Sequence, residues 1–378
     1  MGESMTDTTA IDPALARARD SRQAMAMDPH PLAGVESCMG LTEREGIGPP
    51  LEEELPSGYV LDGRFVIGEA IGRSAMATIY RAEDRVRGGT VAVKIPLMKV
   101  QNDPASFGRF QREERICSTL CGPMLLRFIP VDDAAKSRPY FVTEFLDGCT
   151  LAYVIHRRRP LPEGDALRIA SVVCQALGQM HARRIIHRDV KPANIMICRD
   201  QRLCLLDFGL AAEADAGQGI LAGLTPLFGT PEYMAPEQVR NKENDVRTDI
   251  YSLGVILYQM LTGVLPFQGE DPWAAAQLRV TGDPVAPRSI NPAVTPQAEE
   301  IVLRALRRAP EERYQTVAAF RADLDAPERV HVTGLSGRLQ APHFRISLHG
   351  TPILAGVIIG VGSLAFLVGL FFLLMRHR

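Results

Sequence analysis

The chain has 378 residues and a net charge of −2, so it carries no overall basic field of the kind that attracts nucleic acid, and we expect no nucleic-acid partner. Its seven cysteines are scattered and form no CxxC pair, which argues against a disulfide framework and fits a reducing compartment. Mean hydropathy is zero although 23% of the residues are charged, so apolar residues must be concentrated in one part of the chain.

Residues 1–58 are predicted to form a disordered acidic tail. This segment holds eleven acidic residues against four Arg and no Lys, and it has few aromatic or β-branched side chains. Such a composition buries too little apolar surface to offset the entropy lost on folding. We therefore expect the first folded domain to begin at Tyr59.

The segment from residue 59 to residue 325 is predicted to be one α+β domain with two lobes. The first lobe, 59–146, contains short β-rich runs separated by turn residues, at 65–68, 78–82, 91–95 and 140–144, and one helical stretch at 106–120. The second lobe, 147–325, is predicted to be larger and helical, because helical periodicity recurs at 167–183, 249–261, 298–306 and 316–324.

The end of the chain is predicted to anchor it in a lipid bilayer. A linker at 326–350 precedes residues 353–375, which carry no charge and only one polar side chain, Ser363. A helix of this length spans about 34 Å, enough for a bilayer core of about 30 Å. Small residues four apart, such as Gly356 and Gly360, are compatible with a homodimer of such helices, but glycine is common in membrane helices anyway.

Four motifs follow one another along the predicted domain. They are Val-Ala-Val-Lys at 91–94, His-Arg-Asp-Val-Lys-Pro-Ala-Asn at 187–194, Leu-Asp-Phe-Gly at 206–209 and Gly-Thr-Pro-Glu-Tyr-Met-Ala-Pro-Glu at 229–237. Any one of them is a weak signal, but four in this order are specific. Together they resemble the signature of eukaryotic-type protein kinases, and most of all the serine/threonine kinases of bacteria. The resemblance covers residues 59–324, about 70% of the chain.

The resemblance implies transfer of the ATP γ-phosphate to serine or threonine hydroxyls of proteins, with Mg²⁺ or Mn²⁺ as the metal. Asp189 would align the acceptor hydroxyl, and Lys191 would reach the γ-phosphate. Asn194 and Asp207 would supply oxygen ligands to the metal.

Lys94 would hold the α- and β-phosphates and needs a carboxylate to orient it. We expect Glu113 to do so; its neighbour Glu114 points about 100° away on a helix. The chain has only five lysines against 37 arginines. Two of the five fall at Lys94 and Lys191, where the family needs a compact ammonium that a planar guanidinium does not replace.

The resemblance also implies where the nucleotide would lie. The adenine would contact apolar residues and the backbone of a hinge, drawn from Ile71, Ile79, Ala92, Met196, Glu144 and Leu146. The phosphates would lie under a loop containing Gly72, Ser74 and Ala77. The family has glycine at the last two of these positions. We expect a positive φ at Ala77 to cost about 1 kcal/mol and to weaken ATP binding, while the Ser74 hydroxyl is free to face phosphate.

Regulatory and structural roles follow from the same resemblance. Arg188 would pair with a phosphate on the segment that follows residue 209, where Thr225 is the expected site of autophosphorylation and Thr230 would contact the catalytic loop. Three residues would brace the larger lobe: Glu237 paired with Arg313, and Asp249 beneath the catalytic loop.

The resulting hypothesis is a single-pass protein of the inner or plasma membrane, with a cytoplasmic kinase domain. Two alternatives remain open: a membrane-tethered pseudokinase scaffold, and a kinase that acts on small molecules. The intact set Lys94, Asp189, Asn194 and Asp207 argues against the first. The segment 229–237, which forms the platform for protein substrates in the family, argues against the second.

Overall fold

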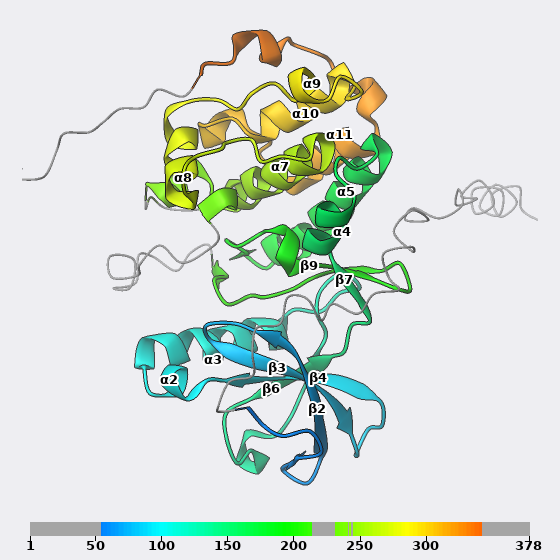
Figure 1. Cartoon of the computed structure of the whole chain (residues 1–378), viewed down its shortest axis with the longest axis vertical. Helices are drawn as coiled ribbons and strands as arrows, with labels where there is room; N and C mark the ends of the chain where they lie inside the picture. The colour runs from blue at the N-terminus through cyan, green and yellow to red at the C-terminus, as the bar shows by residue number, and fades with distance from the viewer. Residues whose placement is uncertain (1–53, 214–230, 241, 243–244, 342–378) are drawn as a thin grey trace, which may run out of the picture. The chain divides into compact units, whose positions relative to one another are not determined.

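The computed structural model describes residues 54–213, 231–240, 242 and 245–341 (Figure 1). The expected sites Thr225 and Thr230, the acidic tail up to residue 53 and the apolar segment 353–375 lie outside the described residues. Among the residues that the structure describes, none of the helices is both long and apolar enough to cross a bilayer.

The first lobe is built on an antiparallel sheet of six strands in the order β1-β2-β3-β4-β6-β5. The strands are β1 (Val60–Leu61), β2 (Phe65–Arg73), β3 (Ala77–Asp84), β4 (Thr90–Pro96), β5 (Phe128–Ile129) and β6 (Phe141–Glu144). Side chains alternate between the two faces of a strand. In β4 the apolar core therefore takes Val91, Val93 and Ile95, and Lys94 lies on the opposite face.

Two helices interrupt the sheet, α2 (Met98–Gln101) and α3 (Pro104–Thr119). The start of α3 is capped by the Asp103 carboxylate, which accepts a hydrogen bond from Ser106 N at 3.0 Å. The buried side of α3 carries Phe110, Glu113 and Ile116 at helical spacing. A carboxylate on that side needs a partner, because an isolated buried charge is costly.

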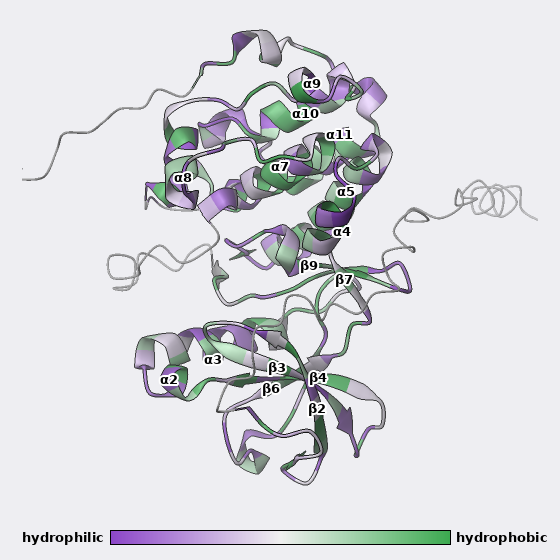
Figure 2. Cartoon of the chain, viewed as in Figure 1, coloured by the Kyte–Doolittle hydropathy of each residue, from purple (hydrophilic) through white to green (hydrophobic). Residues whose placement is uncertain are grey.

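The second lobe is helical, which confirms the predicted α+β, two-lobed arrangement. Its helices are α4 (Leu151–Arg157), α5 (Glu163–His181), α6 (Pro236–Val239), α7 (Val246–Thr262), α8 (Pro272–Thr281), α9 (Pro287–Ile290), α10 (Pro296–Ala305) and α11 (Val317–Asp325). Helix α7 is buried on nearly every side, and its hydrophobic residues lie in the middle of this lobe (Figure 2).

Two small sheets at the start of the second lobe position the chemistry. One has the strand order β10-β9-β7 and contains β7 (Gly148–Thr150), β9 (Ile195–Cys198) and β10 (Leu203–Leu205). The other pairs β8 (Ile185–Ile186) with β11 (Ala212–Glu213). The loop between β8 and β9 carries Asp189 and Asn194, and Asp207 follows β10.

The folded domain is longer than the sequence indicated at both ends. At the start, Gly58 N donates to Ile67 O at 2.7 Å, and Leu55 packs against the core of the sheet. At the end, Asp283 N donates to Gln340 O at 2.8 Å, and Gln340 N donates to the Asp283 carboxylate at 3.0 Å.

Residues 54–58 therefore do not belong to a disordered tail, and residues 327–341 are not a free linker. The second segment covers part of the larger lobe with three apolar side chains, Val330, Leu335 and Leu339. The segment contains only two short 3₁₀ turns, Pro327–Arg329 and Leu335–Arg338, and has no sustained helical or strand period, which is why the sequence pattern suggested a linker.

Candidate active site

The loop between β8 and β9 holds Asp189 in a fixed orientation. Lys191 Nζ donates to Asp189 Oδ2 at 2.7 Å. Asn194, in the 3₁₀ turn Pro192–Asn194, donates through Nδ2 to the same oxygen at 3.1 Å and to the Asp189 carbonyl at 2.9 Å. The structure thus brings together the three residues expected in the catalytic loop.

Asp249 supports this loop from helix α7. Its carboxylate accepts the backbone N–H groups of His187 and Arg188, each at 2.9 Å, and it lies 2.8 Å from His181 Nε2. Burial opposes ionisation of Asp249, but the His181 contact and the N–H donors lower its pKa. Arg188 has a φ of 66°, so the two N–H bonds hold a backbone conformation that is unfavourable for arginine.

Asp207 comes two residues after the end of β10. Its φ is 59°, and its Oδ1 accepts a hydrogen bond from Gly209 N at 3.1 Å. Burial opposes the ionised form of Asp207, but the Lys94 ammonium and the Gly209 N–H favour it, and the pKa of this carboxyl is lowered. The Asp207 side chain is therefore an ionised carboxylate at neutral pH.

Lys94 forms an ion pair with Glu113 of α3, the carboxylate that was expected to orient it. Glu114 instead accepts a hydrogen bond from Lys136 at 2.8 Å. Burial works against the charged ammonium of Lys94, yet the Glu113 and Asp207 carboxylates outweigh it and raise its pKa. A Cβ placed on Gly209 would lie 3.2 Å from Asp207 Oδ1 and 3.4 Å from Glu113 Oε2. The glycine therefore lets both carboxylates approach closely.

The residues present fit a divalent metal. Asn194 uses its amide nitrogen on Asp189, so its side-chain carbonyl oxygen is the atom that could bind a metal. Asp207 contributes an ionised carboxylate. Hard oxygen donors of this kind suit Mg²⁺, which takes its remaining ligands from phosphates and water.

The loop between β2 and β3 corrects one expectation. Ala77 is the first residue of β3, paired with Pro96, and it is not among the residues with positive φ. The expected strain at Ala77 is therefore wrong, because the extended strand has already begun there. Ser74 Oγ accepts from Ala77 N at 3.0 Å and donates to Ala77 O at 3.1 Å, so this hydroxyl closes the loop instead of facing phosphate.

The residues expected around the adenine lie on elements that border the same site. Ile71 and Ile79 are in β2 and β3, Ala92 is in β4, and Met196 is in β9, all of them half-buried. Leu146 is buried against Met196.

The side chain of the hinge residue Glu144 accepts hydrogen bonds from Arg202 Nη2 at 2.9 Å and Arg127 N at 3.0 Å. It also lines a pocket of about 570 Å³ together with Arg202 and Phe128. The Glu144 side chain is thus engaged by these partners.

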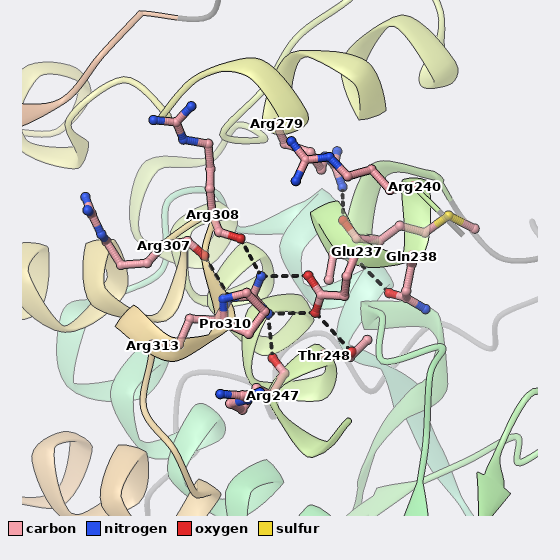
Figure 3. A network of polar contacts seen from close by, with 12 residues as sticks. Glu237, Gln238, Arg240, Arg247, Thr248, Arg279, Arg307, Arg308, Pro310 and Arg313 are labelled. Atoms are coloured by element: carbon pink, nitrogen blue, oxygen red, sulfur yellow. Dashed lines mark hydrogen bonds and ion pairs between the residues drawn. The ribbon is translucent and has the colours of Figure 1, made fainter. Parts of the chain in front are cut away.

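The structure also brings Glu237 and Arg313 together (Figure 3). Arg313 Nη1 and Nη2 donate to the two carboxylate oxygens of Glu237 at 2.8 and 2.7 Å. Thr248 adds a hydrogen bond to Glu237 Oε1 at 3.0 Å. The Arg313 side chain is fully buried, and its remaining N–H groups donate to backbone carbonyls, including that of Arg307.

Two positioning residues had escaped the sequence analysis. Gln238 donates through Nε2 to the Arg188 carbonyl at 2.9 Å and accepts from Ala235 N at 2.9 Å. Buried Arg279 of α8 donates to the Met234 carbonyl at 2.6 Å. They fasten the segment 231–236 to the catalytic loop and to α8. Gln238 could have been noticed as a glutamine three residues after a helix cap, which is a weak signal of a capping box. No sequence signal pointed to Arg279.

Comparison with known proteins agrees with this geometry. The family model described as protein kinase domain matches residues 65–323. The serine/threonine-protein kinase PknB of Mycolicibacterium smegmatis is 38% identical over 295 residues, which cover 75% of this chain and 47% of that protein. Pkn1 of Myxococcus xanthus is 37% identical over 319 residues, covering 83% and 45%. The crystal structure of the PknI kinase domain of Mycobacterium tuberculosis superposes with a TM-score of 0.55 at 25% identity, covering 72% of this chain and 100% of that one.

The fold and the site therefore place the chain in the protein kinase family. Within that family its relatives place the kinase domain among the serine/threonine protein kinases of bacteria. The chain spans about half the length of the curated relatives that it matches.

Proposed function

We propose that this protein transfers the γ-phosphate of ATP to serine and threonine hydroxyls of proteins. The observation that carries the proposal is the arrangement of Lys94, Glu113, Asp189 and Asp207, each held in place by its own charged or hydrogen-bonded partner. A pseudokinase scaffold has no need of a half-buried ammonium that is paired with the Glu113 carboxylate and also feels the charge of Asp207. Burying such charges is costly unless they are paired and used.

The residues divide the work as phosphoryl transfer requires. Asp189 accepts the hydrogen bond of the acceptor hydroxyl and receives its proton, and Lys191, 2.7 Å away, neutralises charge beside it. Lys94, oriented by Glu113, binds the α- and β-phosphates. Asn194 and Asp207 would hold Mg²⁺, which supplies charge neutralisation on the phosphates.

We also propose that Thr225 is autophosphorylated and that its phosphate pairs with Arg188. The pKa of Arg188 is lowered, mainly by burial of its guanidinium. The Asp249 carboxylate raises this pKa in part, and the positive charge of Arg112 lowers it further. Among the described residues, Arg188 Nε has no hydrogen-bond partner. Two arginines close together favour a doubly charged phosphate, which would relieve their repulsion.

Incubation of the purified chain with radiolabelled ATP, Mg²⁺ and a generic protein acceptor tests both proposals. We expect label on phosphoserine and phosphothreonine in the acceptor, and phosphopeptide mapping should find Thr225 labelled in the chain itself. Label on tyrosine alone, or no label, would contradict the activity. An unmodified Thr225 in fully active protein would contradict the second proposal while leaving the first intact.

We further propose that residues 353–375 anchor the protein in the membrane with the kinase domain in the cytoplasm, where ATP is available. The support is the uncharged apolar stretch in the sequence. The full chain should sediment with membranes after an alkaline wash, and a chain ending at Ala341 should stay in the supernatant with unchanged activity. Recovery of both in the supernatant would rule out the anchor. A homodimer through Gly356 and Gly360 is an extension of the same proposal.

A further inference from the structure

The segment that precedes the kinase motifs is attached to the phosphate-binding loop. Glu54 and Arg73 form an ion pair with two contacts, in which Arg73 Nη2 donates to Glu54 Oε2 at 2.8 Å and Arg73 Nε donates to Oε1. Their side chains are only 16% and 14% exposed, in the order Arg73 and Glu54. Arg73 is the last residue of β2, directly before Ser74 of the loop. Paired contacts of this kind fix direction as well as distance.

Neighbouring contacts hold Glu54 in place. Leu55 N donates to the Tyr80 hydroxyl at 3.0 Å, and the Leu55 side chain packs against the core of the first lobe. Tyr80 is itself 3% exposed, so it offers a firm attachment point. The carboxylate of Glu54 thus reaches Arg73 from backbone that is anchored one residue away.

The strand register shows on which face this contact lies. Arg73 pairs with Thr78, which pairs in turn with Ile95 of the buried core. Ile79, one residue further along β3, pairs with Lys94. Residues opposite each other in neighbouring strands share a face, and successive residues alternate. Arg73 therefore lies on the face away from Lys94 and the nucleotide.

We propose that Glu54 is a positioning residue for ATP binding, acting through Arg73 to hold the phosphate-binding loop from its outer face. The inference rests on the proposed function. Because the ion pair lies on the outer face, its effect on ATP comes from ordering the loop and not from charge near the phosphates. A loop that is ordered before binding loses less conformational entropy when the nucleotide arrives.

The acidic tail is thereby linked to the nucleotide site. Glu54 directly follows Glu52 and Glu53, the last residues of the predicted acidic tail before the described residues begin.

The test measures the Kd of ATP·Mg²⁺ by titration calorimetry, and KM and kcat by phosphate transfer. We expect Glu54→Gln and Arg73→Gln each to raise Kd and KM about five- to tenfold with kcat within about twofold. The double variant should be no worse than either single one, and the exchange of Glu54→Arg with Arg73→Glu should restore most of the affinity. Glu83→Gln, an exposed carboxylate on β3, is the matched control and should change neither constant.

An unchanged Kd in Glu54→Gln would overturn the proposal, as would a lower melting temperature with unchanged Kd, which would make the ion pair purely structural. Equal losses in Glu83→Gln would also overturn it. The binding measurement and the transfer measurement test different claims. If the wild type transfers no phosphate but Glu54→Gln still raises Kd, the proposed function is overturned and this inference stands.

Discussion

Replacement of Asp189 by Asn is expected to lower kcat by about 10²–10⁴-fold, the range that a positioned acid–base group contributes. Asn can occupy the same space and still receive the hydrogen bonds of Lys191 and Asn194, but it cannot accept the proton of the acceptor hydroxyl. Binding of ATP should change little, because the proposed role of Asp189 is toward the acceptor hydroxyl and not toward the nucleotide base. Initial rates of radiolabel transfer at saturating ATP give kcat directly.

Asp200→Asn is the matched control. Asp200 is also a loop carboxylate, 66% exposed, and it follows the same strand β9 that the catalytic loop leads into. Its replacement should leave kcat within about twofold of wild type, since surface changes away from such sites have small effects. Equal transfer by Asp189→Asn and wild type would favour a scaffold that binds nucleotide without using it.

The largest loss of stability is expected from Arg313→Met. The variant leaves the Glu237 carboxylate buried without its partner, which costs about 3–5 kcal/mol in comparable buried pairs. For a domain of this size, that corresponds to a fall in melting temperature of roughly 6–20 °C. The network in Figure 3 adds to the effect, because the backbone carbonyls bonded to Arg313 lose their donor as well. Thermal unfolding followed by circular dichroism measures the change.

An exposed ion pair provides the comparison. Arg199 and Asp147 lie 3.0 Å apart with side chains 56% and 66% exposed, so Arg199→Met should cost about 1 kcal/mol or less. The double variant Glu237→Leu, Arg313→Met should be more stable than Arg313→Met alone, because no unpaired charge remains buried. A melting temperature of Arg313→Met equal to that of Arg199→Met would show that the pair contributes little.

The sequence was sufficient for the parts of the site that local pattern controls. The resemblance to protein kinases predicted that Asp189, Lys191 and Asn194 lie together in one loop, and the structure places them in mutual contact. Helical geometry predicted that Glu113 and Glu114 could not both face Lys94, and the structure shows that Glu113, the expected residue, is the buried one.

Contacts between distant segments that the kinase resemblance does not supply could not be predicted in this way. The partner of Arg279 is a backbone carbonyl, which every residue has, so nothing in the sequence distinguishes Met234. The ion pair of Glu54 with Arg73 joins a segment of tail-like composition to a strand end. The absence of strain at Ala77 depends on where β3 begins, and a shift of one or two residues in that boundary reverses the expectation.

The packing of residues 327–341 against the larger lobe shortens the chain that is available to connect the kinase domain to the proposed membrane anchor. Only residues 342–352 separate the packed segment from the apolar stretch at 353–375. Even fully extended, such a stretch reaches about 40 Å. If the apolar stretch lies in a bilayer, the packed end of the kinase domain stays within about 40 Å of the membrane surface. Its acceptors are then proteins that bring a serine or threonine close to the membrane surface, and a cytosolic protein must be recruited there before it can be phosphorylated.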